Sequence, residues 1–422
     1  MKDADAAVRG DRAADAIAGS DRPAHAPQGS PGEVFRAFLK LGISAFGGPI
    51  AHLGYFRDEF VTRRRWVDEA GYADLVALCQ FLPGPASSQV GFALGLMRAG
   101  PLGGLAAWTA FTLPSAILLI LFAAGASAFD SGIGAAIVHG LKVVAVAVVA
   151  QAVFGMARSL CPDRTRATIA VVAVVAVVAL AGSLGQIAAI VMGGLAGLWF
   201  CRADAAVLPP IPMVPVSRTA GLVALAVFAV LLILLPVFAA MDPAATGAGP
   251  VALFDAFYRA GALVFGGGHV VLPLLQAFVV EPGWASDDAF LAGYGAAQAV
   301  PGPLFTFAAY LGAIASPQGY GLPGAVIGLV AISLPGLLLV VAALPFWDEF
   351  RRRVTAQAAM RGANAAVVGI LGAALYDPVF VNAVRGPADF ALALAGFVAL
   401  VVWKAPPWTV VLACAIASIA IA

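Results

Sequence analysis

Long apolar runs separated by short polar stretches follow one another along this chain of 422 residues. A helix needs roughly 20 apolar residues to cross the core of a bilayer, with about 17–25 tolerated. Runs near this length predict six membrane helices in the first half, at about 34–56, 72–97, 102–128, 133–157, 166–182 and 184–201. Six more are expected at about 251–279, 288–314, 320–346, 360–376, 388–403 and 406–422. A further apolar run, 219–240, lies between the two halves.

The second half of the chain repeats motifs of the first half. F-R-A-F-L-K-L-G-I-S-A-F-G-G-P begins at Phe35, and F-D-A-F-Y-R-A-G-A-L-V-F-G-G-G begins 219 residues later at Phe254. Further matches follow: Trp66 with Trp284, Gln80 with Gln298, Pro83-Gly84-Pro85 with Pro301-Gly302-Pro303, Leu113-Pro114-Ser115 with Leu334-Pro335-Gly336, and Gly140-Leu141-Lys142 with Gly362-Ala363-Asn364. A duplicated half inside a very apolar chain is typical of secondary transporters, whose site lies where the copies meet.

The run 219–240 has no counterpart in either copy. A single extra crossing between two six-helix halves inserts the second half upside down relative to the first. The sequence therefore predicts an all-α integral membrane protein of about 13 transmembrane helices, in two inverted-topology repeats with broken or re-entrant helices. We expect a disordered cytoplasmic tail at 1–30, an N-terminal repeat at 31–204, a linker with the unmatched helix at 205–249, and a C-terminal repeat at 250–422.

Positive charge predicts a cytoplasmic N-terminus and a periplasmic C-terminus in a bacterial inner membrane. With this orientation, arginines such as Arg98 and Arg351–Arg353 lie in inner loops, and the outer loops carry only Arg385. One loop disagrees, because Arg57 and Arg63–Arg65 would lie outside if 35–56 crossed the membrane. A segment that enters the membrane and returns at its Gly-Gly break would instead keep these arginines inside.

Composition agrees with this membrane assignment. The chain is 62% hydrophobic and 11% charged, whereas soluble proteins carry about 25% charged residues. Its net charge of +1 gives no hint of a nucleic-acid partner. The four cysteines and four histidines are scattered, so no metal site or cofactor is expected. No P-loop motif is present, which excludes ATP as an energy source within this polypeptide.

The repeated Gly and Pro motifs carry the candidate chemistry. Gly47-Gly48-Pro49 and Gly266-Gly267-Gly268 interrupt apolar runs, as do both Pro-Gly-Pro motifs. An open backbone in hydrocarbon is tolerated only where it lines a cavity or is buried in protein. A half-helix that begins at such a break presents partial positive charge to an anion. The alternative is that the breaks are packing kinks whose Ser and Thr side chains bond back to the helix; the matched copies favour a site.

Charges within the runs extend this candidate site. Lys40 and Arg259 are matched bases, each six residues before a Phe-Gly-Gly break, and together they suit a doubly charged anion. Alternatively, each base extends to the lipid headgroups. Lys142 lies deeper in its run, and its counterpart Asn364 is neutral. The candidate substrate-binding residues are Lys40, Gly47, Gly48, Gln80, Pro83, Gly84, Pro85, Ser87, Ser88, Lys142, Arg259, Gly266, Gly267, Gly268, His269, Gln298, Pro301, Gly302, Pro303 and Thr306.

These motifs resemble the chromate transporter family. The resemblance rests on F-x-x-F-x-K-L-G-x-x-x-F-G-G-P and Q-F-L-P-G-P in the first half, and F-G-G-G-H-V-V-L-P and Q-A-V-P-G-P in the second. It covers about 33–204 and 250–422. It implies a two-domain, long-chain member that exports chromate across the inner membrane using the chemiosmotic gradient, with sulfate as a related or competing anion.

Several alternatives stay open at the level of sequence. Chromate and sulfate are both tetrahedral dianions, and nothing in the chain separates them. A passive anion channel would use the same repeats and helix ends. An enzyme is not expected, because no convergent acid–base or nucleophile set is present. The expected partners are the oxyanion and membrane lipid, and a homo-oligomer is compatible with the sequence.

Overall fold

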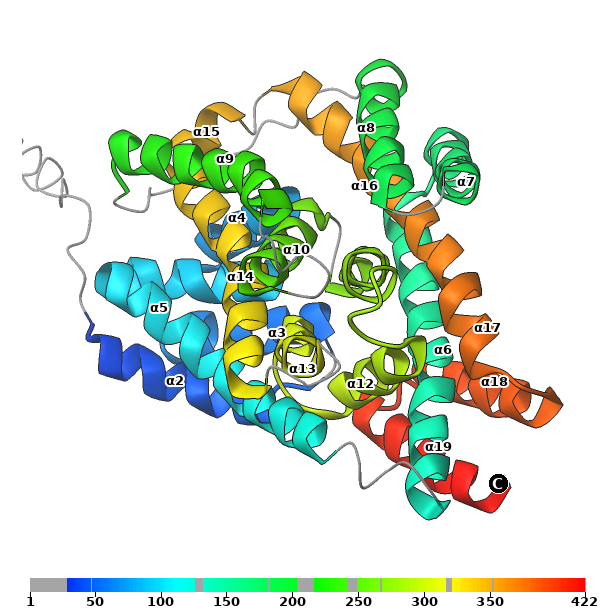
Figure 1. The fold of residues 1–422 in the computed structure, drawn as a ribbon. Helices are drawn as coiled ribbons and strands as arrows, with labels where there is room; N and C mark the ends of the chain where they lie inside the picture. Colours follow the sequence, from blue (N-terminus) through cyan, green and yellow to red (C-terminus); the bar gives the residue numbers. More distant parts are fainter. Residues whose placement is uncertain are drawn as a thin grey trace, which may run out of the picture.

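The computed structural model describes residues 29–46, 48–125, 132–180, 183–202, 216–241, 249–265, 268–315, 321–350 and 353–421, and within these ranges it is helical and has no strand (Figure 1). Gly47, Gly266, Gly267 and nearly all of the expected tail at 1–30 lie outside the described residues.

The helices follow the order expected from the apolar runs. In the first half they are α2 (Pro31–Ser44), α3 (Gly48–Phe56), the π-helix η1 (Arg57–Arg63), α4 (Glu69–Phe81), α5 (Ala86–Ala124), α6 (Gly132–Leu160), α7 (Arg164–Ala179) and α8 (Ser183–Phe200). The unmatched run forms α9 (Arg218–Met241). The second half contains α10 (Pro250–Leu263), η3 (Gly268–Val270), α11 (Val271–Leu275), η4 (Gln276–Val280), α12 (Asp287–Ala299), η5 (Leu304–Thr306), α13 (Phe307–Ile314), α14 (Gly321–Ala343), η6 (Leu344–Phe346), α15 (Trp347–Phe350), α16 (Val354–Ala374), η7 (Leu375–Phe380), α17 (Val381–Ala383), α18 (Pro387–Val401) and α19 (Pro407–Ile421).

Five helical segments of the described chain are long and apolar enough to cross a membrane. They are Ala86–Ala124, Gly132–Leu160, Arg218–Met241, Gly321–Phe346 and Val354–Ala383. The other apolar helices, such as the 15-residue α18, are only about 20–25 Å long at 1.5 Å per residue. A bilayer core is about 30 Å thick, so the expected count of about 13 transmembrane helices is not confirmed.

Four of the expected runs are each made of two shorter helices. The run 34–56 is divided between α2 and α3, 72–97 between α4 and α5, 251–279 between α10 and η3, and 288–314 between α12 and η5. Each division coincides with a Gly-rich or Pro-Gly-Pro motif. The sequence reason is that Pro removes a backbone donor, and Gly accepts dihedral angles that other residues avoid.

Helix α5 also changes direction within its length. Ala99 and Gly100 leave the helical region, with φ values of −143° and +68°. A Cβ added to Gly95 would lie 2.4 Å from the Gly103 carbonyl oxygen, so the backbones before and after the break pack against each other. The 39-residue run is therefore a hairpin, in which only the part from Pro101 to Ala124 continues as a long helix.

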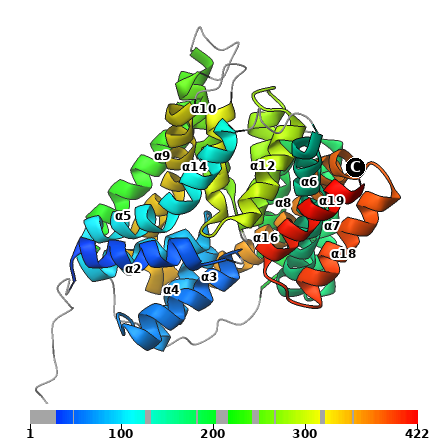
Figure 2. The same cartoon turned by 90° about the horizontal axis from the view of Figure 1, so that it is seen from below.

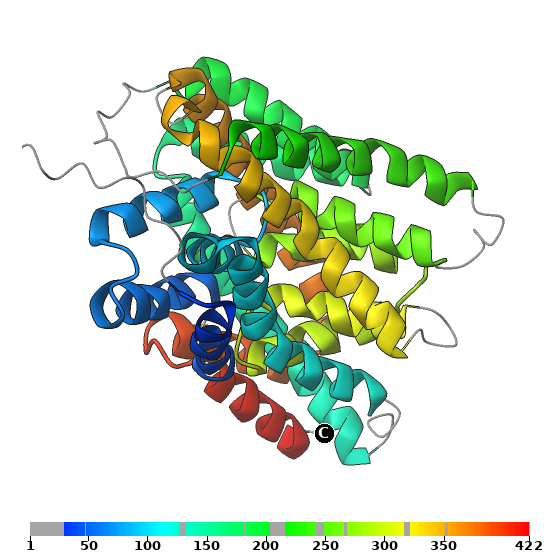
Figure 3. The same ribbon diagram turned by 90° about the vertical axis from the view of Figure 1, so that its left-hand side faces the viewer.

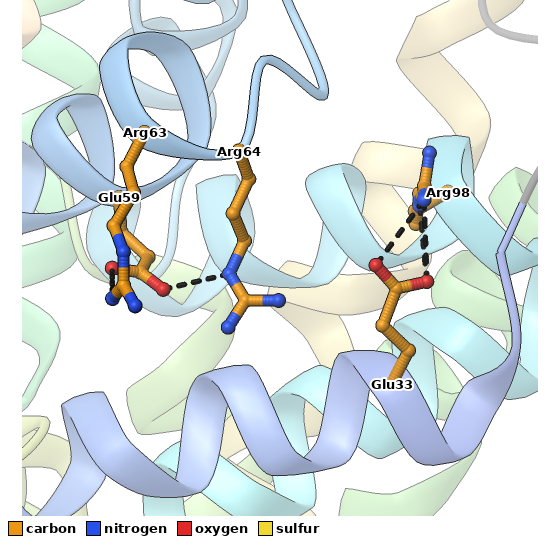
Figure 4. A network of polar contacts seen from close by, with 5 residues as sticks. All are labelled: Glu33, Glu59, Arg63, Arg64 and Arg98. Carbon is orange, nitrogen blue, oxygen red and sulfur yellow. Dashed lines mark hydrogen bonds and ion pairs between the residues drawn. The ribbon is translucent and has the colours of Figure 1, made fainter.

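A polar network joins the ends of the first two broken helices (Figure 4). Arg98, near the end of the first part of α5, pairs with Glu33 in the first turn of α2 at 3.2 Å. The guanidiniums of Arg98 and Arg64 lie 5.2 and 5.6 Å from the centroid of the same Trp66 ring. The start of α2, the end of η1 and the end of the first part of α5 therefore lie together. Each broken helix returns to the side on which it began, as the loop with four arginines required.

Glu59 stabilises the same region. Its carboxylate accepts hydrogen bonds from Arg64 at 2.6 Å and from Arg63 at 2.9 Å. Burial raises the pKa of the Glu59 carboxyl, but the two guanidiniums outweigh it and hold this pKa below its usual value. The carboxylate is thus ionised at neutral pH, and two of the arginines in this loop are neutralised in part.

The halves exchange packing partners in a reciprocal way. Figures 1 and 2 show α6 beside α18 and α19 of the other half, and α16 beside α7 and α8. A Cβ added to Gly362 of α16 would lie 2.0 Å from the Gly193 carbonyl oxygen of α8. One added to Gly140 of α6 would lie 2.7 Å from Ala415 Cα of α19. Both residues of the second pair are offset by 222 from their counterparts in the first, so the two contacts are equivalent.

The remaining helices form a second reciprocal set. Within each half, the first helix packs against the helix that follows the hairpin. Gly42 of α2 approaches the Phe111 backbone of α5, and Gly261 of α10 approaches the Ile332 backbone of α14. The unmatched α9 lies outside α10 and α14 (Figure 3), and most of its side chains are exposed.

Candidate functional site

The broken helices of the two halves meet through backbone hydrogen bonds. The Gly84 N–H, in the first Pro-Gly-Pro, donates to the Val264 carbonyl at the end of α10, at 2.7 Å. The Gly302 N–H, in the second Pro-Gly-Pro, donates to the Ala45 carbonyl at the end of α2, at 2.9 Å. Gly302 and Val264 are 218 and 219 residues after Gly84 and Ala45. The two bonds are therefore equivalent under the sequence repeat, and each joins one half to the other.

A third contact lies between the other two motifs. A Cβ added to Gly268 would lie 3.4 Å from Pro49 Cγ. Pro49 is the residue that the repeat equates with Gly268, 219 positions earlier. Equivalent positions of the two halves thus face each other directly.

Both Pro-Gly-Pro glycines adopt positive φ angles, +121° at Gly84 and +96° at Gly302. A Cβ at Gly84 would lie 3.0 Å from Gly336 Cα, and one at Gly302 would lie 2.8 Å from Ser115 Oγ. Ser115 and Gly336 are themselves matched in the repeat. The long helices α5 and α14 therefore close the site from equivalent positions, and only glycine fits at the two turns.

Helices begin at this site without side-chain caps. Pro85 precedes the first turn of α5 and Pro303 precedes η5, and neither provides a capping hydrogen bond. The first N–H groups of a helix have no acceptor within the helix, and they carry partial positive charge. Because these starts lie next to the cross-half bonds, the centre of the molecule offers N–H donors to an anion.

The predicted hydroxyl and amide residues behave differently from one another. Ser87, Ser88 and Thr306 are all buried, but the Thr306 hydroxyl donates to the Pro303 carbonyl at 2.7 Å and so bonds back to its own turn. Gln80 is exposed, whereas the Gln298 Nε2 is buried and has no hydrogen-bond partner among the described residues. The matched glutamines thus do not occupy matched environments.

The two matched bases are not equivalent in the structure either. Lys40 lies on the exposed side of α2. Arg259 is paired with the buried Asp255 one turn earlier and lies 4.6 Å from the centroid of the Phe278 ring. The residue equivalent to Asp255 in the first half is Arg36, which is why the ion pair has no counterpart there. In this conformation Arg259 is neutralised by a partner in its own helix.

Lys142 and His269 also have partners within the protein. The Lys142 ammonium is almost fully buried and lies 2.5 Å from the Asp288 carboxylate at the start of α12. The His269 Nδ1 shares a hydrogen bond of 2.7 Å with the Tyr294 hydroxyl of α12. Both contacts fix α12, the helix that leads into the second Pro-Gly-Pro.

Several residues of the site were not among the sequence candidates. Gln89 is fully buried, and its Nε2 donates to the Pro83 carbonyl at 2.9 Å and to the Gly336 carbonyl at 3.1 Å. His52 is fully buried and contacts Ser87, and Ser115 lies against Gly302. The available signal was position, since Gln89 follows Pro85 by one helical turn and Ser115 belongs to a repeated motif.

A separate apolar cavity of about 420 Å³ lies between α7 and α8, and its lining includes Ile169, Val172, Met192 and Phe200. It contains none of the candidate residues. Its lining offers no charged group for an oxyanion, so the cavity does not compete with the central breaks as the candidate site.

Comparison with known proteins gives the same pattern of two halves. The model of the chromate transporter family matches residues 32–198 and again residues 251–419. The chain belongs to the chromate transporter family. A chromate transport protein of Pseudomonas aeruginosa is 30% identical to it over 384 residues, which cover 88% of this chain and 87% of that protein. A probable chromate transport protein of Synechococcus elongatus is 29% identical over 372 residues, which cover 87% and 88%. No solved structure matches the chain significantly.

Membership of the chromate transporter family and the five long apolar helices make this chain a multi-pass membrane protein with a transport function. Both family matches include the motifs that meet at the centre, since 32–198 contains Gly84 and 251–419 contains Gly302. The paired breaks are thus features of both copies of the family's unit.

Proposed function

We propose that this protein is a secondary active transporter, and not an enzyme, that exports chromate across the bacterial inner membrane and so confers chromate resistance. The relatives named as chromate transport proteins support the substrate. The observation that carries the mechanism is the pair of equivalent hydrogen bonds, Gly84 N–H to the Val264 carbonyl and Gly302 N–H to the Ala45 carbonyl.

The anion would bind between these two bonds. Uncapped helix starts after Pro85 and Pro303 supply N–H donors, and Ser87, Ser88 and the Gln298 amide supply side-chain donors. A tetrahedral dianion accepts hydrogen bonds in several directions, which suits donors that converge from both halves. Lys40, Lys142 and Arg259 would then act on the approach to the site, because in this conformation Lys142 and Arg259 are held by acids.

We propose further that the halves, 31–204 and 250–422, are inverted repeats. Reciprocal contacts of equivalent residues are what a two-fold relation generates. The five long helices are an odd number of crossings, and hairpins that return to their own side add none. This arrangement supports a cytoplasmic N-terminus and a periplasmic C-terminus, and it keeps the loop with Arg57 and Arg63–Arg65 inside.

Transport into everted membrane vesicles tests active export. Vesicles that contain the protein should accumulate chromate when energised, and an uncoupler should abolish the accumulation. Vesicles without the protein are the control. Uptake that is unaffected by the uncoupler would contradict a secondary active mechanism, and single-channel currents far above carrier turnover would identify a passive anion channel.

Competition on the reconstituted protein tests the substrate. Chromate uptake should be inhibited by sulfate more strongly than by phosphate, because sulfate matches chromate in charge and geometry. Molybdate extends the series to a larger tetrahedral dianion. If sulfate is itself transported at a higher rate than chromate, the protein is a sulfate transporter that also accepts chromate.

A further inference from the structure

His52 is a buried titratable residue that the proposed transport mechanism does not yet use. It lies in α3, one turn after the first Gly-Gly break, and its side chain is fully buried. Its Nδ1 is 3.4 Å from Ser87 Oγ, and its ring centroid is 5.2 Å from that of Phe111. Its Nε2 is buried and has no hydrogen-bond partner among the described residues. A buried polar atom without a partner is unusual and calls for a ligand, a water or a proton.

The position of His52 links it to the proposed anion site. Ser87 belongs to the first turn of α5, immediately after the Pro-Gly-Pro motif. The imidazole also faces the Ala45 carbonyl, which accepts the hydrogen bond from Gly302. His52 is therefore next to one helix start and one cross-half bond. The equivalent residue of the second half is Val271, 219 positions later, so this titratable group exists on one side of the repeat only.

No described charged side chain contacts the imidazole. The elements packed around it contribute the Ala45 carbonyl from α2, Ser87 and Phe111 from α5, and Tyr72 from α4, whose hydroxyl donates to the Leu53 carbonyl at 2.6 Å. The charged residues of these elements and of η1 are Glu33, Arg36, Lys40, Arg57, Asp58, Glu59, Arg63, Glu69, Asp74 and Arg98; those with partners pair with one another or with Trp347. A buried imidazolium without a counter-ion is costly, so His52 is neutral until an anion supplies the negative charge.

We propose that His52 takes up one proton when the anion binds, so that proton and anion cross the membrane together. The inference rests on the proposed transport function. The neutral Nε2 accepts a proton from the aqueous side to which the site is open, and the resulting imidazolium is stabilised by the dianion at the start of α5. Release of the anion on the other side removes this counter-charge, and the proton leaves with it. No bond other than N–H is formed or broken.

Proteoliposomes separate this inference from the function on which it rests. Exchange of labelled for unlabelled anion at equal pH on both sides needs the anion site but no net proton movement. Accumulation driven by an imposed pH gradient, with the membrane potential clamped at zero, needs a coupled proton. One proton per anion and a gradient of about one pH unit allow up to about tenfold accumulation.

The wild-type protein should show both exchange and pH-driven accumulation. His52→Gln, which keeps an amide donor but cannot be protonated, should exchange at a rate within about threefold of wild type and accumulate nothing above equilibrium. His139→Gln is the matched control: this histidine pairs with Asp389 between α6 and α18, and its variant should keep both activities. Accumulation retained by His52→Gln would overturn the proposal, whereas a wild-type protein without exchange would overturn the transport function itself.

A second measurement does not depend on the variant folding well. Addition of sulfate or chromate to weakly buffered wild-type protein should raise the pH of the solution by an amount that corresponds to about one proton taken up per chain. Anion binding without proton uptake would overturn the proposal.

Discussion

At the scale of single residues, the two Pro-Gly-Pro glycines are the most constrained positions of this chain. Each combines a positive φ with a close approach to the other half, Gly84 to Gly336 and Gly302 to Ser115. Any Cβ there meets both a backbone cost and a steric one. The sequence indicated these positions through the repeat, but it did not indicate what opposes them.

Gly302→Ala should reduce transport strongly and destabilise the protein by about 1–3 kcal/mol, because alanine resists this φ and its Cβ would lie 2.8 Å from Ser115 Oγ. Adding Ser115→Gly, the residue present at the matched position Gly336, should recover part of the lost transport by removing the steric contact. Gly54→Ala is the control, since nothing lies within 4 Å of a Cβ there. Vesicle transport and thermal unfolding measure both effects, and full activity of Gly302→Ala would contradict the assigned packing.

Arg259 illustrates a residue whose sequence pattern and structural setting differ. Its pairing with the buried Asp255 predicts that Arg259→Met alone lowers stability, by up to about 3 kcal/mol, because an unpaired carboxylate stays buried. The double variant Arg259→Met/Asp255→Asn should recover most of the loss in Tm. If its transport recovers as well, Arg259 is structural; if transport stays low at restored stability, the base also acts on the anion. Lys40→Ala, at an exposed position, should leave the Tm unchanged.

The residue-level site was predictable only in part. Motif spacing located the breaks, since Gly and Pro have direct backbone consequences. Spacing did not distinguish Gln80, which is exposed, from Gln89, which is buried and bonded to Gly336. The difference depends on which face of each half-helix is covered, and that is decided by contacts with the other half, 247 residues away in the case of Gln89 and Gly336.

At the scale of elements, helix positions followed from the sequence and their routes did not. Apolar length and Gly-Pro interruptions predicted where helices begin, end and break, because these depend on local hydrogen bonding and burial. Whether a broken helix crosses or returns depends on tertiary contacts. The Glu33–Arg98 pair and the shared Trp66 ring, which place the ends of two broken helices together, decide this for the first half.

Re-entry of the broken helices is testable by labelling single cysteines, in a protein whose four native cysteines are replaced. Thr62→Cys, in η1, should react with an impermeant thiol reagent only from the side of the N-terminus. Pro282→Cys, in the matching loop of the second half, should react only from the opposite side. Both positions are exposed, so accessibility is set by topology. Reaction of Thr62→Cys from the side opposite to the N-terminus would show that the first broken helix crosses.

At the scale of the whole molecule, each half completes the other. The helix α6 packs on α18 and α19, and α16 packs on α7 and α8. The glycine contacts at Gly140 and Gly362 bring these helices to backbone distance. Close backbone approach through small residues is how membrane helices associate, because lipid provides no hydrophobic drive between them. Neither half therefore buries its own small-residue faces.

Expression of the chain as two pieces should reveal this dependence. A piece ending in the loop between α8 and α9 and a piece beginning at α9 should each be degraded or aggregate when produced alone. Produced together, they should form a stable complex that transports chromate, measured by co-purification and vesicle uptake. The intact chain is the control. A stable, monodisperse first half on its own would contradict the reciprocal packing.

The pair of backbone bonds between the halves has a consequence for how a carrier avoids leaking. In an inverted arrangement, the Gly84–Val264 bond and the Gly302–Ala45 bond lie toward opposite faces of the membrane. Rupture of one while the other holds would admit water from a single face. The duplication would thus provide two seals of the same design, and the bound ion would meet each compartment in turn without ever connecting them.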